Sequence, residues 1–118
     1  MDRVSKKTDQ QDCLSRMLPI RDTLDVISGK WKMMILVSIM HGNNRFRDIE
    51  RSIPKITSKV LAKELKDLEE HMLIKRTVYD DYPVLIKYTA TDYAGTLENI
   101  MNELHDWGLN HRKKILGK

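Results

Sequence analysis

The segment PKITSKVLAKELKDLEE, residues 54–70, decides the fold predicted for this chain. Pro54 fits poorly inside a helix, and Thr57 can cap one by accepting a bond from a free backbone N–H group. A helix is therefore predicted over about residues 57–70. At about 100° per residue, three leucines share a narrow stripe and three lysines lie almost opposite it. These residues are Leu61, Leu65 and Leu68 on one side, and Lys59, Lys63 and Lys66 on the other.

The lysine face of this helix has two short hydroxyl side chains at its first turn. Thr57 and Ser58 can reach base edges in a DNA major groove, and phosphates attract the lysines. A charged face is also what any solvent-exposed helix carries. The helix alone therefore leaves both interpretations open, and its neighbours must decide between them.

The length and charge of the chain are compatible with a small nucleic-acid-binding domain. The 118 residues predict one domain, with 41% hydrophobic and 32% charged residues. The net charge of +4 and the pI of about 9.2 favour an anionic partner. Between Arg45 and Lys66 there are seven basic and three acidic residues, so this segment alone carries an excess of four.

The single cysteine and the polar N-terminus indicate the compartment. Cys13 has no partner for an intramolecular disulfide, which fits a reducing environment. Residues 1–12 lack the apolar run of a signal peptide and are predicted to form a flexible tail. The longest apolar run, Met33 to Met40, is too short to span a bilayer. We expect a cytoplasmic protein with no membrane partner.

The residue pattern argues against catalysis. The chain has no Gly-rich phosphate loop and no nucleophile–base constellation, and its four histidines lack metal-ligand spacing. We therefore expect neither an enzyme nor a metal or other cofactor. Trp31 and Phe46 are predicted to be core aromatics rather than part of a cofactor site.

Two helices are predicted before the turn that precedes residue 57. The first covers about residues 20–27 and ends at Ser28-Gly29. The second, about residues 31–40, is apolar almost all round and is expected to be buried centrally. Gly42 and the asparagines after it end this helix, because both residue types tolerate a left-handed backbone.

A helix-turn-helix and a wing follow. Residues 46–52 have helical apolar spacing, and a short turn through Pro54 joins them to the basic helix. Residues 73–79 and 84–90 are β-branched and aromatic, and the residues between them favour a turn. This hairpin, about residues 73–90, is the predicted wing.

The last helix, capped by Thr91 and covering about residues 92–116, is a predicted dimerisation helix. It has more apolar positions than a lone peripheral helix must bury, and two-fold pairing would cover them. The alternative is that it packs back onto its own core. The predicted dimer interface consists of Leu18, Ile20, Leu24, Leu97, Ile100, Met101, Leu104 and Trp107.

Several of these motifs together resemble the HxlR-type winged helix-turn-helix regulators, which are MarR-like. The matching residues are Gly29-Lys30-Trp31, Ile35-Leu36, Gly42, Arg45-Phe46-Arg47-Asp48-Ile49, the run Ile56 to Leu61, Leu65, Leu68, Glu69, Tyr88-Thr89-Ala90-Thr91, Gly95, Leu97 and Trp107-Gly108. The resemblance covers about residues 13–111. It implies a mainly α fold with a small β-hairpin, residues 13–118 as the domain, and N- and C-terminal helices forming a homodimer interface. It also implies transcriptional regulation, with repression as the expected sign and a pseudo-palindromic operator.

Three regions of the chain depart from the pattern of this family. Leu14 follows Cys13 where members often have proline. His71 and Met72 follow the basic helix where a glycine is usual, so a different C-cap is expected. In the wing, Val84 follows Pro83 where many members have a basic residue. Asp80 and Asp81 lie at the wing tip, where carboxylates would repel phosphates, which shifts the expected affinity toward the helix.

The resulting hypothesis is sequence-specific binding of double-stranded DNA by a homodimer. The predicted DNA-contacting residues are Arg45, Lys55, Thr57, Ser58, Lys59, Lys63 and Lys66. The resemblance also implies that Cys13 is a candidate sensor of oxidants or electrophiles. The alternative is an unreactive cysteine with no sensing role. Two further hypotheses stay open at this point. One is control by a small-molecule effector in a dimer-interface cavity, and the second is a protein-interaction module that does not bind DNA.

Overall fold

The leucine stripe of residues 57–70 packs into the centre of the molecule. In the computed structural model, which describes residues 6–117, this segment forms helix α4 (Ser58–Glu70). Leu61, Leu65 and Leu68 are at most 2% exposed. Burying one leucine contributes roughly 1.5–3 kcal/mol, so the stripe fixes the rotation of α4 firmly.

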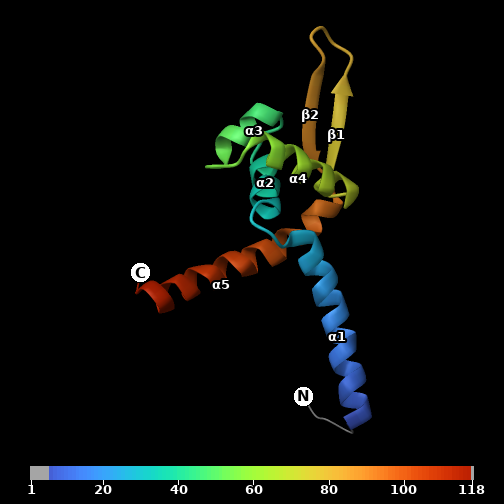
Figure 1. Cartoon of the computed structure of the whole chain (residues 1–118), viewed down its shortest axis with the longest axis vertical. Coiled ribbons are helices and arrows are strands. Elements are labelled where there is room, and N and C mark those ends of the chain that lie inside the picture. Colours follow the sequence, from blue (N-terminus) through green and yellow to red (C-terminus); the bar gives the residue numbers. More distant parts are fainter. Residues whose placement is uncertain (1–5, 118) are drawn as a thin grey trace.

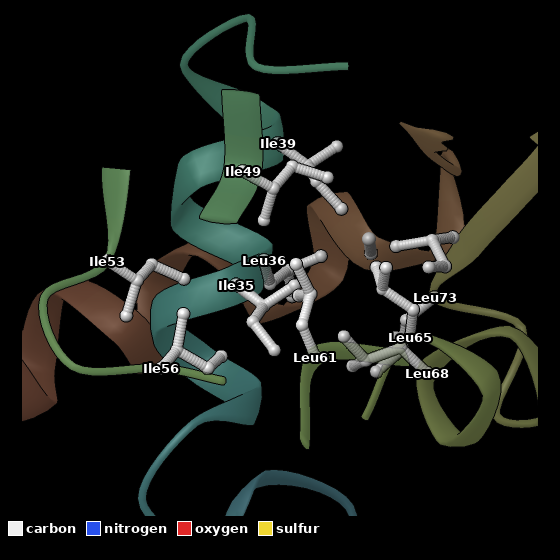
Figure 2. Close-up of a cluster of buried hydrophobic side chains, with 12 residues drawn as sticks. Ile35, Leu36, Ile39, Ile49, Ile53, Ile56, Leu61, Leu65, Leu68 and Leu73 are labelled. Atoms are coloured by element: carbon white, nitrogen blue, oxygen red, sulfur yellow. The ribbon is translucent and has the colours of Figure 1, made fainter. Parts of the chain in front are cut away.

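Helices α2 (Lys32–Met40) and α3 (Phe46–Ser52) form the other side of this core (Figure 2). Trp31 and Phe46 pack against it, as predicted. The members of the cluster besides the α4 leucines are Ile35, Leu36, Ile39, Ile49, Ile53, Ile56, Leu73, Ile74 and Ala94.

Helix α2 is only partly buried, which corrects the expectation of a central helix covered on all sides. Met34, Val37 and Met40 remain exposed, because the elements of a single chain cover only one face of α2. The left-handed φ of 102° at Gly42 ends this region, as predicted.

The hairpin forms as predicted, with each strand shorter by one residue at its start. Strands β1 (Ile74–Tyr79) and β2 (Leu85–Ala90) pair antiparallel from Ile74 opposite Ala90 to Tyr79 opposite Leu85. The Tyr88 N–H group also donates to the Asn44 carbonyl (2.7 Å), which fastens the segment before α3 to β2. The wing therefore has a fixed base and extends away from the core (Figure 1).

The C-terminal helix starts later than predicted. A 3-10 turn, η1 (Tyr93–Leu97), precedes α5 (Glu98–Leu116). Thr91 caps this turn, because its Oγ1 accepts a bond from the Ala94 N–H group (3.1 Å). Its hydroxyl also lies 2.7 Å from the Met72 carbonyl, so the cap is tied to the end of α4.

Helix α1 (Lys6–Ile27) is longer than the predicted segment 20–27. Residues 1–5 of the predicted tail lie outside the described residues, and residues 6–12 form the first turns of α1. The helix continues through Pro19, although a proline inside a helix removes one N–H donor and its ring crowds the carbonyl of the preceding turn. The Thr23 hydroxyl donates to the Pro19 carbonyl (2.8 Å) in the following turn.

Helices α1 and α5 diverge from the core as two arms (Figure 1). The molecule measures 66 × 37 × 23 Å, and its radius of gyration is 18.4 Å. A compact domain of this length would have a radius of about 13–14 Å. The arms thus leave much of their own surface uncovered. No helix in the described part of the chain is long and apolar enough to cross a membrane.

An ion pair fastens α2 to α4. The Lys32 Nζ atom lies 2.6 Å from Glu64 Oε2 and 3.5 Å from Asp67 Oδ2. The Lys32 and Glu64 side chains are only 14% and 13% exposed. The hydrogen bond to Glu64 raises the pKa of Lys32 above 10.5 despite the opposing effect of burial.

Because the folded-state pKa of Lys32 is raised, its stabilisation is complete below pH 10.5 and is lost as the pH rises through the folded-state value. We predict that Lys32→Met lowers the free energy of unfolding by about 2 kcal/mol at neutral pH, because Glu64 loses its partner. Urea unfolding measured from pH 7 to above pH 11 checks this. The exposed-site control Lys66→Met should stay near wild type, and a pH-independent deficit would contradict the assignment.

The C-cap of α4 corrects the expectation of an unusual helix end. The Met72 N–H group donates to the Glu69 carbonyl and the Leu73 N–H group to the Leu68 carbonyl, both at 3.0 Å. This is the Schellman arrangement, and it places Met72 in the left-handed region with φ of 63°. The helix therefore ends with the backbone geometry that usually requires glycine, although Met72 occupies that position.

We predict that Met72→Gly stabilises the fold by about 0.5–1 kcal/mol. Glycine removes the left-handed strain, which outweighs its greater freedom in the unfolded chain. The Met72 side chain is 72% exposed, so little packing is lost. Thermal and urea unfolding provide the measurement. Met72→Ala, which keeps the Cβ atom, should give no such gain, and equal gains for both variants would exclude the explanation.

Candidate nucleic-acid interface

The outer face of α4 carries the polar side chains predicted to contact DNA. Lys59, Lys63 and Lys66 are exposed, whereas the leucines on the opposite side are buried. The predicted division of this helix into a buried and an exposed face is confirmed. A row of three ammonium groups therefore faces solvent along one side of the helix.

The first turn of α4 is held by two hydroxyl groups. Thr57 is the N-cap, and its Oγ1 accepts a bond from the Val60 N–H group (3.2 Å), as predicted. The Ser58 hydroxyl donates to Glu50 Oε2 across the turn. The contact to Glu50 was not predicted from sequence, because only the folded turn brings α3 beside this hydroxyl.

The turn between α3 and α4 places Lys55 in front of the helix. The Ile56 N–H group donates to the Ile53 carbonyl (3.5 Å), and both isoleucines are buried. Lys55 has a left-handed φ of 69° and an exposed side chain, as in a type II turn with proline at its second position. The buried isoleucines thus hold a strained, outward-facing lysine.

Arginines gather where α3 meets the wing. Arg45, Arg47 and Arg51 line a hollow of about 450 Å³ together with Val84 and Ile86 of the β2 side of the hairpin. Arg45 was a predicted contact, but Arg47 and Arg51 were not. Their spacing of four residues on α3 was a usable signal, because it places both on one face of the helix.

The wing carries charge of both signs. Asp80 and Asp81 at its tip are exposed, as are Lys75 and Arg76 on β1. The Lys87 ammonium group lies 5.5 Å from the centroid of the Tyr79 ring. The positive charge of the wing therefore lies along its strands, and the negative charge lies at its end.

The residues predicted for the dimer interface separate into two groups. Leu97 and Met101 pack against the chain's own core. The other six are exposed on the two arms: Leu18, Ile20, Leu24, Ile100, Leu104 and Trp107. The Trp107 ring stacks on His111 with centroids 4.7 Å apart. Cys13 is exposed on α1.

A second hollow, of about 610 Å³, lies between α2, α3 and α5. Met33, Val37 and Met101 are among its apolar lining residues, and Ser38 and Asn43 are among the polar ones. These two polar residues already bond each other, because the Asn43 amide donates to Ser38 Oγ (3.1 Å). Among the described residues, no group of three or more His, Cys, Asp or Glu side chains is placed to hold a metal ion.

Comparison with known proteins agrees with this geometry. The family model for the HxlR-like helix-turn-helix matches residues 26–115. The chain is 38% identical over 100 residues to the HTH-type transcriptional regulator YtcD of Bacillus subtilis, covering 85% of this chain and 79% of that protein.

Two solved structures have the same arrangement of elements. The redox regulator HypR in its reduced form is 34% identical, with a TM-score of 0.77, over 85% of this chain and 99% of that one. The reduced form of the transcriptional regulator YodB from B. subtilis is 28% identical, with a TM-score of 0.70, over 82% and 91% of the two chains. The chain therefore belongs to the HxlR-like helix-turn-helix family of transcriptional regulators.

Proposed function

We propose that this regulator binds a pseudo-palindromic DNA operator as a homodimer and represses transcription. The observation that carries the proposal is the outer face of α4, where exposed lysines follow a capped, hydroxyl-bearing first turn. In a helix-turn-helix, the N-terminal part of the second helix contacts base edges in the major groove. Thr57, Ser58 and Lys59 occupy that part of α4.

The remaining basic residues fit a role in holding phosphates. Lys55 comes just before the first turn of α4, and Lys63 and Lys66 continue along its outer face. Arg45 is the N-cap of α3 and lies on the side of the wing. Contacts to phosphates fix the position of a protein on the duplex without selecting sequence. Arg47 and Arg51 extend this basic surface toward the wing.

We predict that Lys63→Ala weakens operator binding and flattens its salt dependence. Each lost phosphate contact removes about 0.9 from the slope of log K against log salt, or roughly 1.8 for two subunits. Fluorescence anisotropy at several salt concentrations measures both quantities. Lys114→Ala, on the last turn of α5, is the control. An unchanged slope in Lys63→Ala would mean that this face of α4 does not meet the DNA backbone.

Exposed apolar side chains on α1 and α5 support the proposed dimer. Apolar side chains on α1 and α5 stay exposed in the single chain, including Leu24, Leu104 and Trp107. The hollow between α2, α3 and α5 is continuous with this surface through Leu104. Pairing of two copies along the arms would cover both, and it would place two copies of α4 on one face for successive major grooves.

We predict that Leu104→Arg shifts the protein to monomers, because a guanidinium group is costly to bury in an apolar seam. Sedimentation velocity measures the change, and operator affinity should fall with it. Tyr82→Arg, a substitution at a fully exposed wing residue, should remain dimeric. A Leu104→Arg protein of wild-type mass would place the interface elsewhere.

A second proposal concerns Cys13, which is exposed on α1. The neighbouring structure of HypR is that of a redox regulator, which favours a sensing role for this thiol. With one cysteine per chain, Cys13 must form a disulfide with a second chain, or its thiol must be alkylated or capped by a small thiol. An oxidant such as hypochlorite would accept two electrons from the pair of thiols, which would release two protons as the S–S bond forms.

We predict that hypochlorite or a quinone changes the operator affinity of the wild-type protein and leaves Cys13→Ser unaffected. Non-reducing electrophoresis distinguishes a linked dimer from a thiol modified within one chain. Dithiothreitol should restore affinity in the first case. An equal response of Cys13→Ser would assign the effect to another residue, for example an oxidised methionine.

A further inference from the structure

The hydrogen of the Ser58 hydroxyl group is already used in a bond within the protein. Ser58 is the first residue of α4, and its Oγ–H group donates to Glu50 Oε2 on α3. A serine hydroxyl has one hydrogen and two lone pairs, and a carboxylate can only accept. While this bond is made, Ser58 can offer nothing but its lone pairs to a further partner.

The neighbouring hydroxyl has the opposite arrangement. Thr57 Oγ1 accepts a bond from the Val60 N–H group, so one of its lone pairs is used. Among the described residues, no acceptor takes its hydrogen, which is therefore available to donate. The first turn of α4 thus presents two adjacent hydroxyl groups with opposite hydrogen-bonding polarity.

We propose that Glu50 is a positioning residue that makes Ser58 an obligate acceptor and thereby selects an amino-bearing base. This inference rests on the proposed DNA-binding function. In the major groove, adenine presents its N6 amino group and cytosine its N4 amino group, whereas guanine and thymine present only acceptors and a methyl group. Ser58 would therefore favour adenine or cytosine at one position of each half-site, on the strand that it faces.

The same geometry argues against a phosphate as the partner of Ser58. Phosphate oxygens can only accept, so they need the hydrogen that Glu50 already holds. The Glu50 carboxylate would also repel a phosphate brought close to it. An amino group has the complementary character, because it donates and carries partial positive charge. The Glu50–Ser58 pair thus suits a base edge better than the DNA backbone.

The test is selection from a random duplex pool by the full-length protein, followed by affinity measurements on single-base operator variants. Wild type should show one half-site position at which adenine and cytosine are preferred over guanine and thymine, by about two- to tenfold for one hydrogen bond. Ser58→Ala should lose that preference and keep those at other positions. Glu50→Ala should make the position degenerate, because the freed hydroxyl can both donate and accept.

Two further variants separate positioning from other roles. Glu50→Gln keeps an oxygen that can accept from Ser58, so it should retain a weakened preference. In Ser58→Ala, the added Glu50→Ala change should not alter that position again. Glu70→Gln, which removes an exposed charge from the far end of α4, controls for a uniform gain in affinity, and thermal unfolding confirms that each variant is folded.

The outcomes separate this inference from the function on which it rests. Enrichment of an operator with no position changed by Ser58→Ala or Glu50→Ala would overturn the inference and leave DNA binding intact. A preference that survives Ser58→Ala but not Glu50→Ala would show that the carboxylate contacts the base itself, which also overturns it. If wild type enriches no duplex sequence, both proposals fail.

Discussion

The orientation of α4 depends on one packing constraint, the burial of Leu61, Leu65 and Leu68 against α2 and the start of β1. Rotating the helix to bury a lysine would expose leucines worth roughly 1.5–3 kcal/mol each and would remove an ammonium group from water. The Lys32–Glu64 ion pair acts on the same helix and ties its middle to the start of α2. The outward face of α4 is thus a consequence of how its inward face packs.

The parts of the fold predicted from sequence are those whose signal is local. The period of the leucines, the Thr57 cap and the β-branched strands each lie within one short segment, so α4 and the wing were predicted almost to the residue. The predictions were wrong at two helix ends, where a rule based on one residue type did not hold. The first helix was predicted from about residue 20, but α1 begins earlier and continues through Pro19. The absence of glycine suggested a different cap, but Met72 adopts the left-handed conformation because buried Leu68 and Leu73 hold both sides of the turn.

The details of the candidate site were less predictable, because they join residues that are distant in sequence. The Glu50–Ser58 bond spans eight residues and the Lys32–Glu64 pair spans 32, and no periodicity connects their members. The arginine hollow likewise needs α3 and β2 to meet. The charged and hydroxyl residues of the site could be predicted from the sequence. Only the folded chain shows which of their hydrogen-bonding groups are already occupied.

The charge distribution indicates how the proposed DNA contact would be shared between helix and wing. Asp80 and Asp81 oppose a close approach of the wing tip to phosphates, while Arg45, Arg47 and Arg51 lie beside Val84 and Ile86, in the half of the wing nearer its tip. The arginines and the two aspartates therefore lie toward the same end of the wing, where the carboxylates reduce the attraction of the arginines for phosphates. Binding energy would then concentrate around the first turn of α4. That is also where the buried isoleucines hold Lys55 and Glu50 holds Ser58, so the side chains proposed to discriminate between sequences would be positioned by the fold before DNA binds.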